Sequence, residues 1–251
     1  MKQKLALVLA CRNSGKRLYG KPLQILDVKK HISVLEFIIS KAKKYKFIKS
    51  IVLAIASGKQ NNIYEEIADK NKIKYVFGSE QDVLQRLIIS GKKTQASDVL
   101  RITPESPFTY WEKLHDIWSE HKKNKYDASF LDNIIDGCGF EILNLKILKK
   151  IHSKTSKLEK EHCTLYLRKN YKKFNIKRFF PEKSLRRFDM RLTIDYPEDL
   201  ILCRYIFNNY KNIYNYDLFK IIKLLERNKP MLKLVKKYVR KGYKSMYRWG
   251  K

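Results

Sequence analysis

Residues 4–23 read KLALVLACRNSGKRLYGKPL, a short apolar run that passes directly into a loop rich in glycine and positive charge. The first seven residues are typical of a buried β-strand, because the run is apolar after Lys4 and ends at a glycine-containing loop. An exported leader begins in a similar way, but the apolar stretch from Leu5 to Ala10 is shorter than the ~7–15 residues of a signal core. The pattern therefore favours a buried first strand.

Strand-like and helix-like segments then alternate along the chain. We expect further strands at 48–56, 74–77, 98–103, 128–131, 140–143 and 191–194. We expect helices at 33–44, 62–70, 80–90, 110–122, 145–152, 160–172, 197–210 and 216–227. The helix at 80–90 follows Ser79, a good N-cap residue, and carries Glu80 and Asp82 in its first turn. Alternation of this kind predicts βαβ units, a mainly parallel sheet and the α/β fold class.

The composition is that of a strongly basic globular protein. The chain has 251 residues, and its 55 Lys+Arg against 25 Asp+Glu give a formal charge of +30. Hydrophobic residues make up 44%, which is enough for a core and too many for a disordered chain. No apolar run approaches the ~18 residues of a membrane span, so we expect a cytoplasmic protein.

The four cysteines stand far apart and form no CxxC pair: Cys11, Cys138, Cys163 and Cys203. A structural zinc site needs clustered thiolates or imidazoles, and the histidines do not cluster with these cysteines. We therefore expect free thiols in a reducing compartment.

The positive charge is densest in residues 228–251, which we call the basic tail. Lys233 to Lys251 contains eight Lys or Arg and no acid, with tyrosines and a tryptophan between them. Three interpretations are open: contacts to phosphates and stacked bases, weak contact with an anionic surface, and a solvated helix end. For the charge of the whole chain, compositional drift is the alternative to an anionic partner.

The loop after the first strand has the composition of a phosphate site. Ligands of open α/β sheets gather at the carboxyl ends of strands. Gly15 and Gly20 let backbone amides turn toward an oxyanion. Four cations are available to surround a polyphosphate: Arg12, Lys16, Arg17 and Lys21. A solvent-exposed basic loop is the alternative, and the loop matches neither GxxxxGK[ST] nor GxGxxG.

Five stretches in order resemble a known family. Residues 11–21 (CRNSGKRLYGK) are similar to A-R-x-G-S-x-R-L-P-G-K, and residues 77–86 (FGSEQDVLQR) to G-S-E-x-D-V-L-x-R. Residues 100–107 (LRITPESP) resemble V-R-V-T-G-D-x-P, residues 161–166 (EHCTLY) resemble E-H-V-T-P-Y, and residues 191–200 (RLTIDYPEDL) resemble R-L-T-V-D-T-P-E-D-L. These are motifs of the cytidylyltransferases that make CMP-activated acidic sugars, and in particular of the SpsF-like branch of spore coat polysaccharide biosynthesis.

The resemblance implies a three-layer, Rossmann-like nucleotidyltransferase fold, GT-A-like, with a mostly parallel central sheet. Residues 1–227 would form this domain, the segment at about 137–185 would dimerise and cover the acceptor, and the basic tail would be helical. The implied reaction transfers CMP from CTP to an acidic sugar of the sialic or ulosonic acid type and releases pyrophosphate. The implied assembly is a homodimer.

The resemblance also implies roles for individual residues. Arg12, Arg17 and Lys21 would bind the CTP phosphates over the Ser14–Gly15 backbone, with Ser79 also at the nucleotide and with Arg12 and Lys21 catalytic. Glu105 and Asp195 would hold Mg²⁺. Arg101, His162 and Arg191 would meet the acceptor.

Some positions depart from the family pattern or have a second interpretation. Gly-Ser is reversed in Ser14–Gly15, Tyr19 replaces proline, and Pro104–Glu105 replaces Gly-Asp, so the loop is stiffer and its carboxylate is one methylene longer. Other residues have simple structural interpretations: ion pairs for Arg101 and Arg191, a structural role for His162, an N-cap for Asp195, solvent exposure for Asp199, and a turn for residues 136–139.

Three function classes therefore remain open. The first is the cytidylyltransferase, with an inactive or diverged paralogue as its variant. The second is a basic nucleic-acid-binding protein, although no helix-turn-helix, RNP-like or zinc-finger motif is present. The third is a glycosyltransferase that uses a nucleotide sugar, against which the clustering of Arg12, Arg17 and Lys21 favours a triphosphate. Magnesium-dependent pyrophosphate release with CTP distinguishes the first class, and salt-sensitive DNA binding distinguishes the second.

Overall fold

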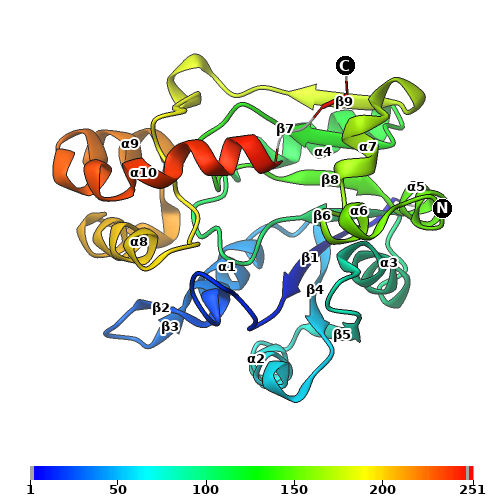
Figure 1. Cartoon of the computed structure of the whole chain (residues 1–251), viewed down its shortest axis with the longest axis horizontal. Helices are drawn as coiled ribbons and strands as arrows, with labels where there is room; N and C mark the ends of the chain where they lie inside the picture. The colour runs from blue at the N-terminus through cyan, green and yellow to red at the C-terminus, as the bar shows by residue number, and fades with distance from the viewer. Residues whose placement is uncertain (1–2, 247–248, 251) are drawn as a thin grey trace.

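A central sheet of seven strands organises residues 3–246 and 249–250, which are the residues that this computed structural model describes (Figure 1). The strand order is β5-β4-β1-β6-β8-β7-β9. The strands are β1 (Leu5–Cys11), β4 (Ile48–Ala56), β5 (Lys74–Gly78), β6 (Asp98–Arg101), β7 (Ala128–Leu131), β8 (Glu141–Asn144) and β9 (Ile176–Phe179). Among them only β8 runs antiparallel to its neighbours. The predicted mainly parallel α/β sheet is confirmed.

Helices cover both faces of the sheet. The described helices are α1 (Val34–Ala42), α2 (Ile63–Lys70), α3 (Val83–Lys93), α4 (Leu114–Lys123), α5 (Leu145–His152), α6 (Lys157–Glu161), α7 (Leu165–Lys169), α8 (Pro197–Asn209), α9 (Leu218–Glu226) and α10 (Lys229–Met246). A small hairpin of β2 (Ile25–Asp27) and β3 (Ile32–Ser33) projects from the sheet (Figure 1).

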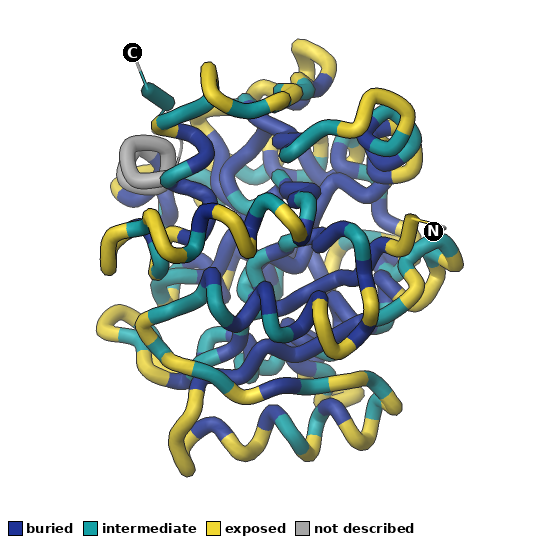
Figure 2. The backbone as a smooth tube through the Cα atoms, turned by 90° about the vertical axis from the view of Figure 1, so that its right-hand side faces the viewer, coloured by how far each residue is buried: buried dark blue, intermediate teal, exposed yellow. Residues whose placement is uncertain are grey.

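The strand β1 shows why three layers form. Leu5, Leu7 and Leu9 point into the larger core, with α1, α2, α8 and α9. Val8 points to the opposite face, into a second core with α3, α5 and α7. Because successive side chains of a strand alternate between faces, an apolar run such as residues 5–11 is buried on both. Figure 2 shows the buried backbone, in dark blue, running through the centre of the molecule. The expected three-layer fold is confirmed.

Four predicted elements are wrong. The helix predicted at 110–122 begins only at Leu114, as α4. Helix α3 begins at Val83, not Glu80, because Asp82 rather than Ser79 caps it and accepts a hydrogen bond from Gln85 N at 2.7 Å. The predicted strand at 191–194 is a single bridge between Arg191 and Asp136. The predicted helix at 160–172 is divided into α6, α7 and a 3₁₀ turn.

The division of that helix has a local cause. His162 ends α6 with φ −88° and ψ 63°, outside the helical region. Two residues later, the Thr164 hydroxyl donates to Glu141 Oε1 at 3.1 Å and so fixes the chain to β8. The break places His162 at the surface, beside the carboxyl end of β6.

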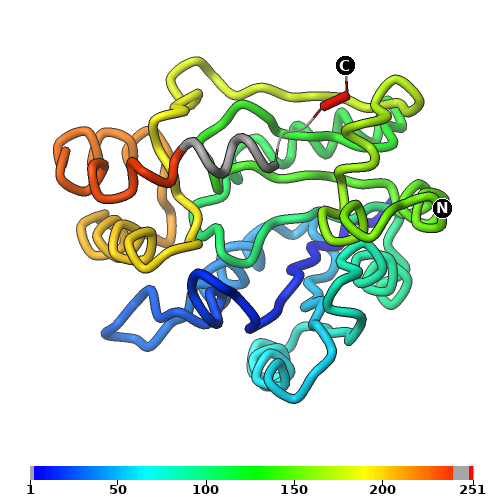
Figure 3. The backbone as a smooth tube through the Cα atoms, viewed as in Figure 1, coloured from blue at the N-terminus to red at the C-terminus, as the bar shows by residue number. Residues whose placement is uncertain are grey.

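The basic tail begins with α10, which packs against α8 and α9 (Figure 1). Its Val235 is wholly buried in the larger core. After the helix, Trp249 and Gly250 lie at α7, where Gly250 N donates to Arg168 O at 3.1 Å (Figure 3). The surface contacts predicted for Arg240 and the later tail cations lie outside the described side chains. No helix among the described residues is long and apolar enough to cross a bilayer.

All four cysteines are buried free thiols, as predicted.

Candidate active site

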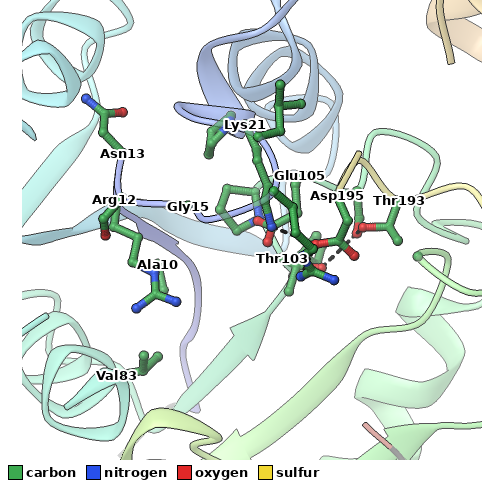
Figure 4. Close-up of a pocket in the computed structure, with 18 of the residues that line it drawn as sticks. Ala10, Arg12, Asn13, Gly15, Lys21, Val83, Thr103, Glu105, Thr193 and Asp195 are labelled. Atoms are coloured by element: carbon green, nitrogen blue, oxygen red, sulfur yellow. Dashed lines mark hydrogen bonds and ion pairs between the residues drawn. The ribbon is translucent and has the colours of Figure 1, made fainter. Parts of the chain in front are cut away.

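A cavity of about 690 Å³ opens at the carboxyl ends of β1 and β6. The loop 12–21 forms one wall, and residues 103–106, 136–137, 161–162 and 193–196 form the others. Figure 4 shows Lys21, Glu105 and Asp195 pointing toward one another, with Arg12 apart from them across the cavity. Segments far apart in the sequence therefore meet at the predicted edge of the sheet.

The loop 12–21 is held from below by α2 and the turn before it. Asn13 N donates to Asn61 Oδ1 at 2.8 Å, and the Tyr64 hydroxyl donates to Arg12 O at 3.2 Å. Gly20 closes the loop with a hydrogen bond to Asn13 O at 3.0 Å and has a φ of +56°. A Cβ at Gly15 would stand 2.5 Å from Leu18 O, so the close turn there requires glycine.

A buried arginine supports the same edge of the sheet. Arg86 Nη1 donates to Cys11 O, at the end of β1, at 3.1 Å and to Ala54 O, near the end of β4, at 2.6 Å. Burial lowers the pKa of Arg86, with Arg12 adding to this effect. Arg86 lines the cavity and places a positive charge directly behind the loop. Its place in the motif at 77–86 was the available signal for this role.

Asp195 is the point where the site's cations converge. Lys21 Nζ and Arg17 Nη2 each donate to Asp195 Oδ1 at 2.6 Å, and Arg191 Nη2 donates to Oδ2. Burial alone would raise the pKa of Asp195, but Lys21, Arg191 and Arg17 outweigh it and lower the pKa. The carboxylate is therefore ionised and fixed in place at neutral pH.

Arg191 holds this carboxylate from behind. Its side chain is 1% exposed and is paired with Asp136 at 2.9 Å and Asp199 at 2.9 Å as well as with Asp195. Burial raises the pKa of Asp136 to about 6, Asp195 and Asp199 add to this rise, and Arg191 opposes it. Residues 136–137 are thus a wall of the cavity as well as a turn. Arg191 is paired with three carboxylates, which agrees with the ion-pair interpretation of this residue, and its acceptor contact stays a prediction.

Two predictions about the start of α8 are wrong. Asp199 is buried, not exposed to solvent, and accepts hydrogen bonds from Asp195 N at 2.8 Å and Tyr196 N at 2.9 Å. The N-cap is Tyr196 rather than Asp195. Because Asp199 satisfies these amides, the Asp195 side chain stays directed at the cavity.

Glu105 lies beside Asp195 and completes a pair of carboxylates. Its carbonyl accepts a hydrogen bond from Ile194 N at 3.0 Å. Burial raises the pKa of Glu105, Lys21 opposes this, and Asp195 adds to it. Among the described residues no three potential metal ligands cluster. Two carboxylates fit Mg²⁺, which takes oxygen ligands and keeps most positions for water and phosphate.

On the opposite wall, Arg12 faces two carboxylates. Its Nη2 donates to Glu161 Oε1 at 3.4 Å, and its Nη1 lies 3.8 Å from Glu80 Oε1. The Ser14 hydroxyl donates to Glu80 as well. Glu80 and Glu161 lie within the recognised motifs, yet the sequence analysis assigned them no role at the site.

A second, smaller cavity of about 80 Å³ adjoins the first, and both are lined by Arg101, Thr103, Gly137 and His162. Arg101 Nη1 donates to Glu141 Oε2 at 2.8 Å, and Arg168 Nη2 donates to Glu141 Oε1 at 2.9 Å. The lining of the smaller cavity therefore includes two arginines that share one carboxylate, with the exposed His162 at the rim.

The structure brings nearly all the predicted site residues together. Those that line the larger cavity are Arg12, Ser14, Gly15, Arg17, Lys21, Arg101, Glu105, His162, Arg191 and Asp195. Ser79 is exposed and is not among the described lining residues, whereas its neighbour Glu80 is. Tyr196, which also lines the cavity, was quoted in a motif but not predicted at the site.

Comparison with known proteins agrees with this geometry. The chain is 29% identical over 245 residues to the uncharacterized protein MJ1063 of Methanocaldococcus jannaschii, covering 97% of this chain and 99% of that protein. It is 25% identical over 228 residues to the spore coat polysaccharide biosynthesis protein SpsF of Bacillus subtilis, covering 89% and 95%. The solved structure of a cytidylyltransferase from Leptospira borgpetersenii superposes with a TM-score of 0.84 at 22% identity, covering 92% of this chain and 97% of that one.

The family profile described as cytidylyltransferase matches residues 5–239, which include every wall of the cavity. The five motifs had predicted this family. The chain therefore belongs to the cytidylyltransferase family, whose members are CTP-dependent nucleotidyltransferases.

Proposed function

We propose that this protein transfers CMP from CTP to an acidic sugar in the synthesis of a surface polysaccharide or glycan, with release of pyrophosphate. The observation that carries the proposal is the convergence of Arg17 and Lys21 on Asp195, beside Glu105, at the carboxyl end of β1. Cations and carboxylates in one cavity suit a magnesium-bound triphosphate.

The triphosphate would lie along the loop 12–21. Lys21 supplies a point charge and Arg17 a forked hydrogen-bond donor. Phosphate oxygens are acceptors of the same kind as the Asp195 carboxylate oxygen that both side chains contact. Arg12, on the opposite wall, would reach the other end of the phosphate chain. Gly15 permits the close turn of this loop, since a Cβ there would stand 2.5 Å from Leu18 O.

Glu105 and Asp195 would hold Mg²⁺, which supplies charge neutralisation for the phosphates during the reaction. Arg191 keeps Asp195 oriented, because it remains paired with this carboxylate from the buried side. Because the Asp195 carboxylate is already held in place, little ordering of this side chain would be needed when Mg²⁺ binds.

The acceptor would enter from the side of the smaller cavity. Arg101 is positioned to meet a carboxylate there, and His162 at the rim adds a hydrogen-bonding group. The acceptor oxygen forms a bond to the α-phosphorus as the bond from that phosphorus to the pyrophosphate oxygen breaks. Catalysis is then mainly positioning and electrostatic stabilisation, the terms that dominate phosphoryl-type transfer.

Pyrophosphate release tests this proposal. Purified protein is mixed with Mg²⁺, each of the four nucleoside triphosphates and a panel of acidic sugars. We expect release with CTP and one acceptor, and loss of this release in Asp195→Asn. Pyrophosphate release in control mixtures that contain no acceptor would indicate simple hydrolysis of the triphosphate. CTP binding without pyrophosphate release across the whole panel would contradict the acidic-sugar assignment.

The homodimer implied by the family resemblance belongs to the same proposal. Light scattering on the purified protein measures it directly, and a monomer at the enzyme concentration of the assay would contradict it.

A further inference from the structure

The ring of Tyr196 lies between the phosphate loop and α10. Tyr238 stacks on it with ring centroids 3.7 Å apart and an interplanar angle of 9°. The Arg17 guanidinium carbon lies 5.1 Å from the centre of the same ring. Because Tyr238 covers one face of Tyr196 at stacking distance, Arg17 lies over the other. Three side chains from three distant parts of the sequence thus form one stack.

The outer ring of this stack is firmly anchored. Tyr238 is 9% exposed and its hydroxyl donates to Glu198 Oε1 at 2.9 Å. Lys237 Nζ pairs with the same oxygen at 3.1 Å. Val235 and Val239, also on α10, are 0% and 4% exposed. Glu198 lies in the first turn of α8, so these contacts join α10 to the element that follows Asp195.

Arg17, the member of the stack on the phosphate loop, is a candidate phosphate-binding residue. Arg17 stands on an exposed loop, and its own side chain is 46% exposed. An unrestrained arginine loses rotamer freedom when it binds a ligand, which weakens binding. The Arg17 guanidinium lies over the Tyr196 ring and donates a hydrogen bond to the Asp195 carboxylate. These two contacts together hold the guanidinium in place. Removing the support of Tyr196 therefore releases Arg17.

We propose that Tyr238 is a positioning residue of the triphosphate site, acting through Tyr196 on Arg17. The proposal makes α10, the start of the basic tail, part of the nucleotide site. It rests on the proposed placement of the CTP phosphates along the loop 12–21.

Calorimetric titration with magnesium CTP, and separately with inorganic tripolyphosphate, tests the stack on the full chain. Tyr238→Leu removes the aromatic ring, and we expect both ligands to bind roughly three- to tenfold more weakly, the range of a lost aromatic or cation–π contact. Tyr238→Phe keeps the ring and loses the hydroxyl that donates to Glu198, so we expect less than about a twofold change.

Two controls separate positioning from general loosening. Val235→Ala weakens the packing of α10 without touching Tyr196, and affinity should stay within about twofold of the wild type. In an Arg17→Ala background, Tyr238→Leu should have no further effect, because its effect passes through Arg17. Additive losses in this double-mutant cycle, or equal losses in Val235→Ala, would overturn the proposal.

The two ligands also separate the stack from the proposed function. If wild-type protein binds tripolyphosphate but not CTP, the nucleotide assignment fails while the cycle still decides the role of Tyr238. If it binds neither, the triphosphate site and the stack's role are both overturned.

Discussion

At the scale of single residues, Asp195 explains how several positively charged side chains are held close together in one cavity. Lys21 and Arg17 donate to one of its oxygens and Arg191 to the other. A phosphate offers the same kind of oxygen, so in the proposed triphosphate complex Lys21 and Arg17 would exchange one acceptor for another. Arg191 is buried and stays with the carboxylate. The site thus keeps cations ordered without leaving them unpaired, which is costly at a partly buried position.

Lys21→Ala tests this exchange. Lys21 is the less exposed of the two cations on Asp195 Oδ1, and its loss removes a charge-assisted contact of about 1.5–3 kcal/mol. We expect CTP affinity to fall about 10- to 100-fold in calorimetric titration. Lys29→Ala, in the turn between β2 and β3, is the matched control. Equal affinities of Lys21→Ala and wild type would remove Lys21 from the phosphate site.

Glu141 gives a prediction about pH and stability. Burial alone would raise its pKa, but Arg101 and Arg168 outweigh burial and lower it. A carboxyl with a lowered folded-state pKa stabilises the fold above its unfolded-state pKa, about 4.3, and loses this contribution as pH falls through the folded-state value. Glu141→Gln removes the charge and leaves a buried arginine incompletely paired.

We therefore expect Glu141→Gln to lower the free energy of unfolding by about 3 kcal/mol at neutral pH, measured by urea denaturation. The difference from wild type should shrink as the pH is lowered from about 5 to about 3. A difference that stays constant over this range would show that the charge of Glu141 contributes nothing to stability.

Part of the site was predictable because its residues are neighbours in the sequence. Arg12, Arg17 and Lys21 share one loop directly after a strand, so their presence in one cavity follows from local pattern alone. An ion pair was one interpretation of Arg191, but its partner Asp136 lies 55 residues away and was not predictable from the local sequence. The burial of Asp199 follows from the same arginine, and a helix pattern alone places such a residue in solvent.

At the scale of elements, the same distinction holds between local and distant causes. Strands such as β1 and β4 were predictable, since an unbroken apolar run fits a strand buried on both faces. The start of α3 was not, because Ser79 and Asp82 are both good caps. Asp82 is selected by contacts from outside the helix: His152 Nε2 lies 2.8 Å from Asp82 Oδ2, and Lys160 Nζ lies 3.8 Å from it.

These two candidate caps make a matched pair of variants. Asp82→Ala removes the hydrogen bond to Gln85 N and the contact with His152, so we expect a loss of about 1–2 kcal/mol in the free energy of unfolding. Ser79→Ala should change it by less than about 0.5 kcal/mol, because Ser79 is exposed and caps nothing in the described helix. Urea denaturation of both variants decides this, and the reverse order of effects would place the cap at Ser79.

At the scale of the whole molecule, the charge of +30 has opposite effects on folding and on triphosphate binding. It opposes the folded state and favours the binding of an anion. Like charges on a compact chain repel one another, so screening by salt favours the folded state. The same screening weakens the attraction between the cavity and a triphosphate. The two effects can be measured separately, because the repulsion acts over the whole surface and the attraction acts at the cluster of cations in the cavity.

We expect the melting temperature to rise between about 0.05 M and about 0.3 M NaCl, by roughly 2–4 °C for each kcal/mol of repulsion relieved. CTP affinity should fall over the same range. Differential scanning calorimetry and titration calorimetry on one preparation measure the two trends. A melting temperature that falls with added NaCl would mean that favourable ion pairs, such as those of Glu141, dominate the electrostatics.

The stack of Tyr238 on Tyr196 has a consequence for how the protein is made. Chains are synthesised from the N-terminus and begin to fold in that order. The sheet and the loop 12–21 exist early, but Tyr196 stays uncovered until α10 has left the ribosome. A message that ends before codon 238 therefore yields a chain with every cation of the loop and no ring over Tyr196. If Tyr238 positions the phosphate loop as proposed, the nucleotide site would be complete only after α10 is made, and its affinity would report that translation had passed codon 238.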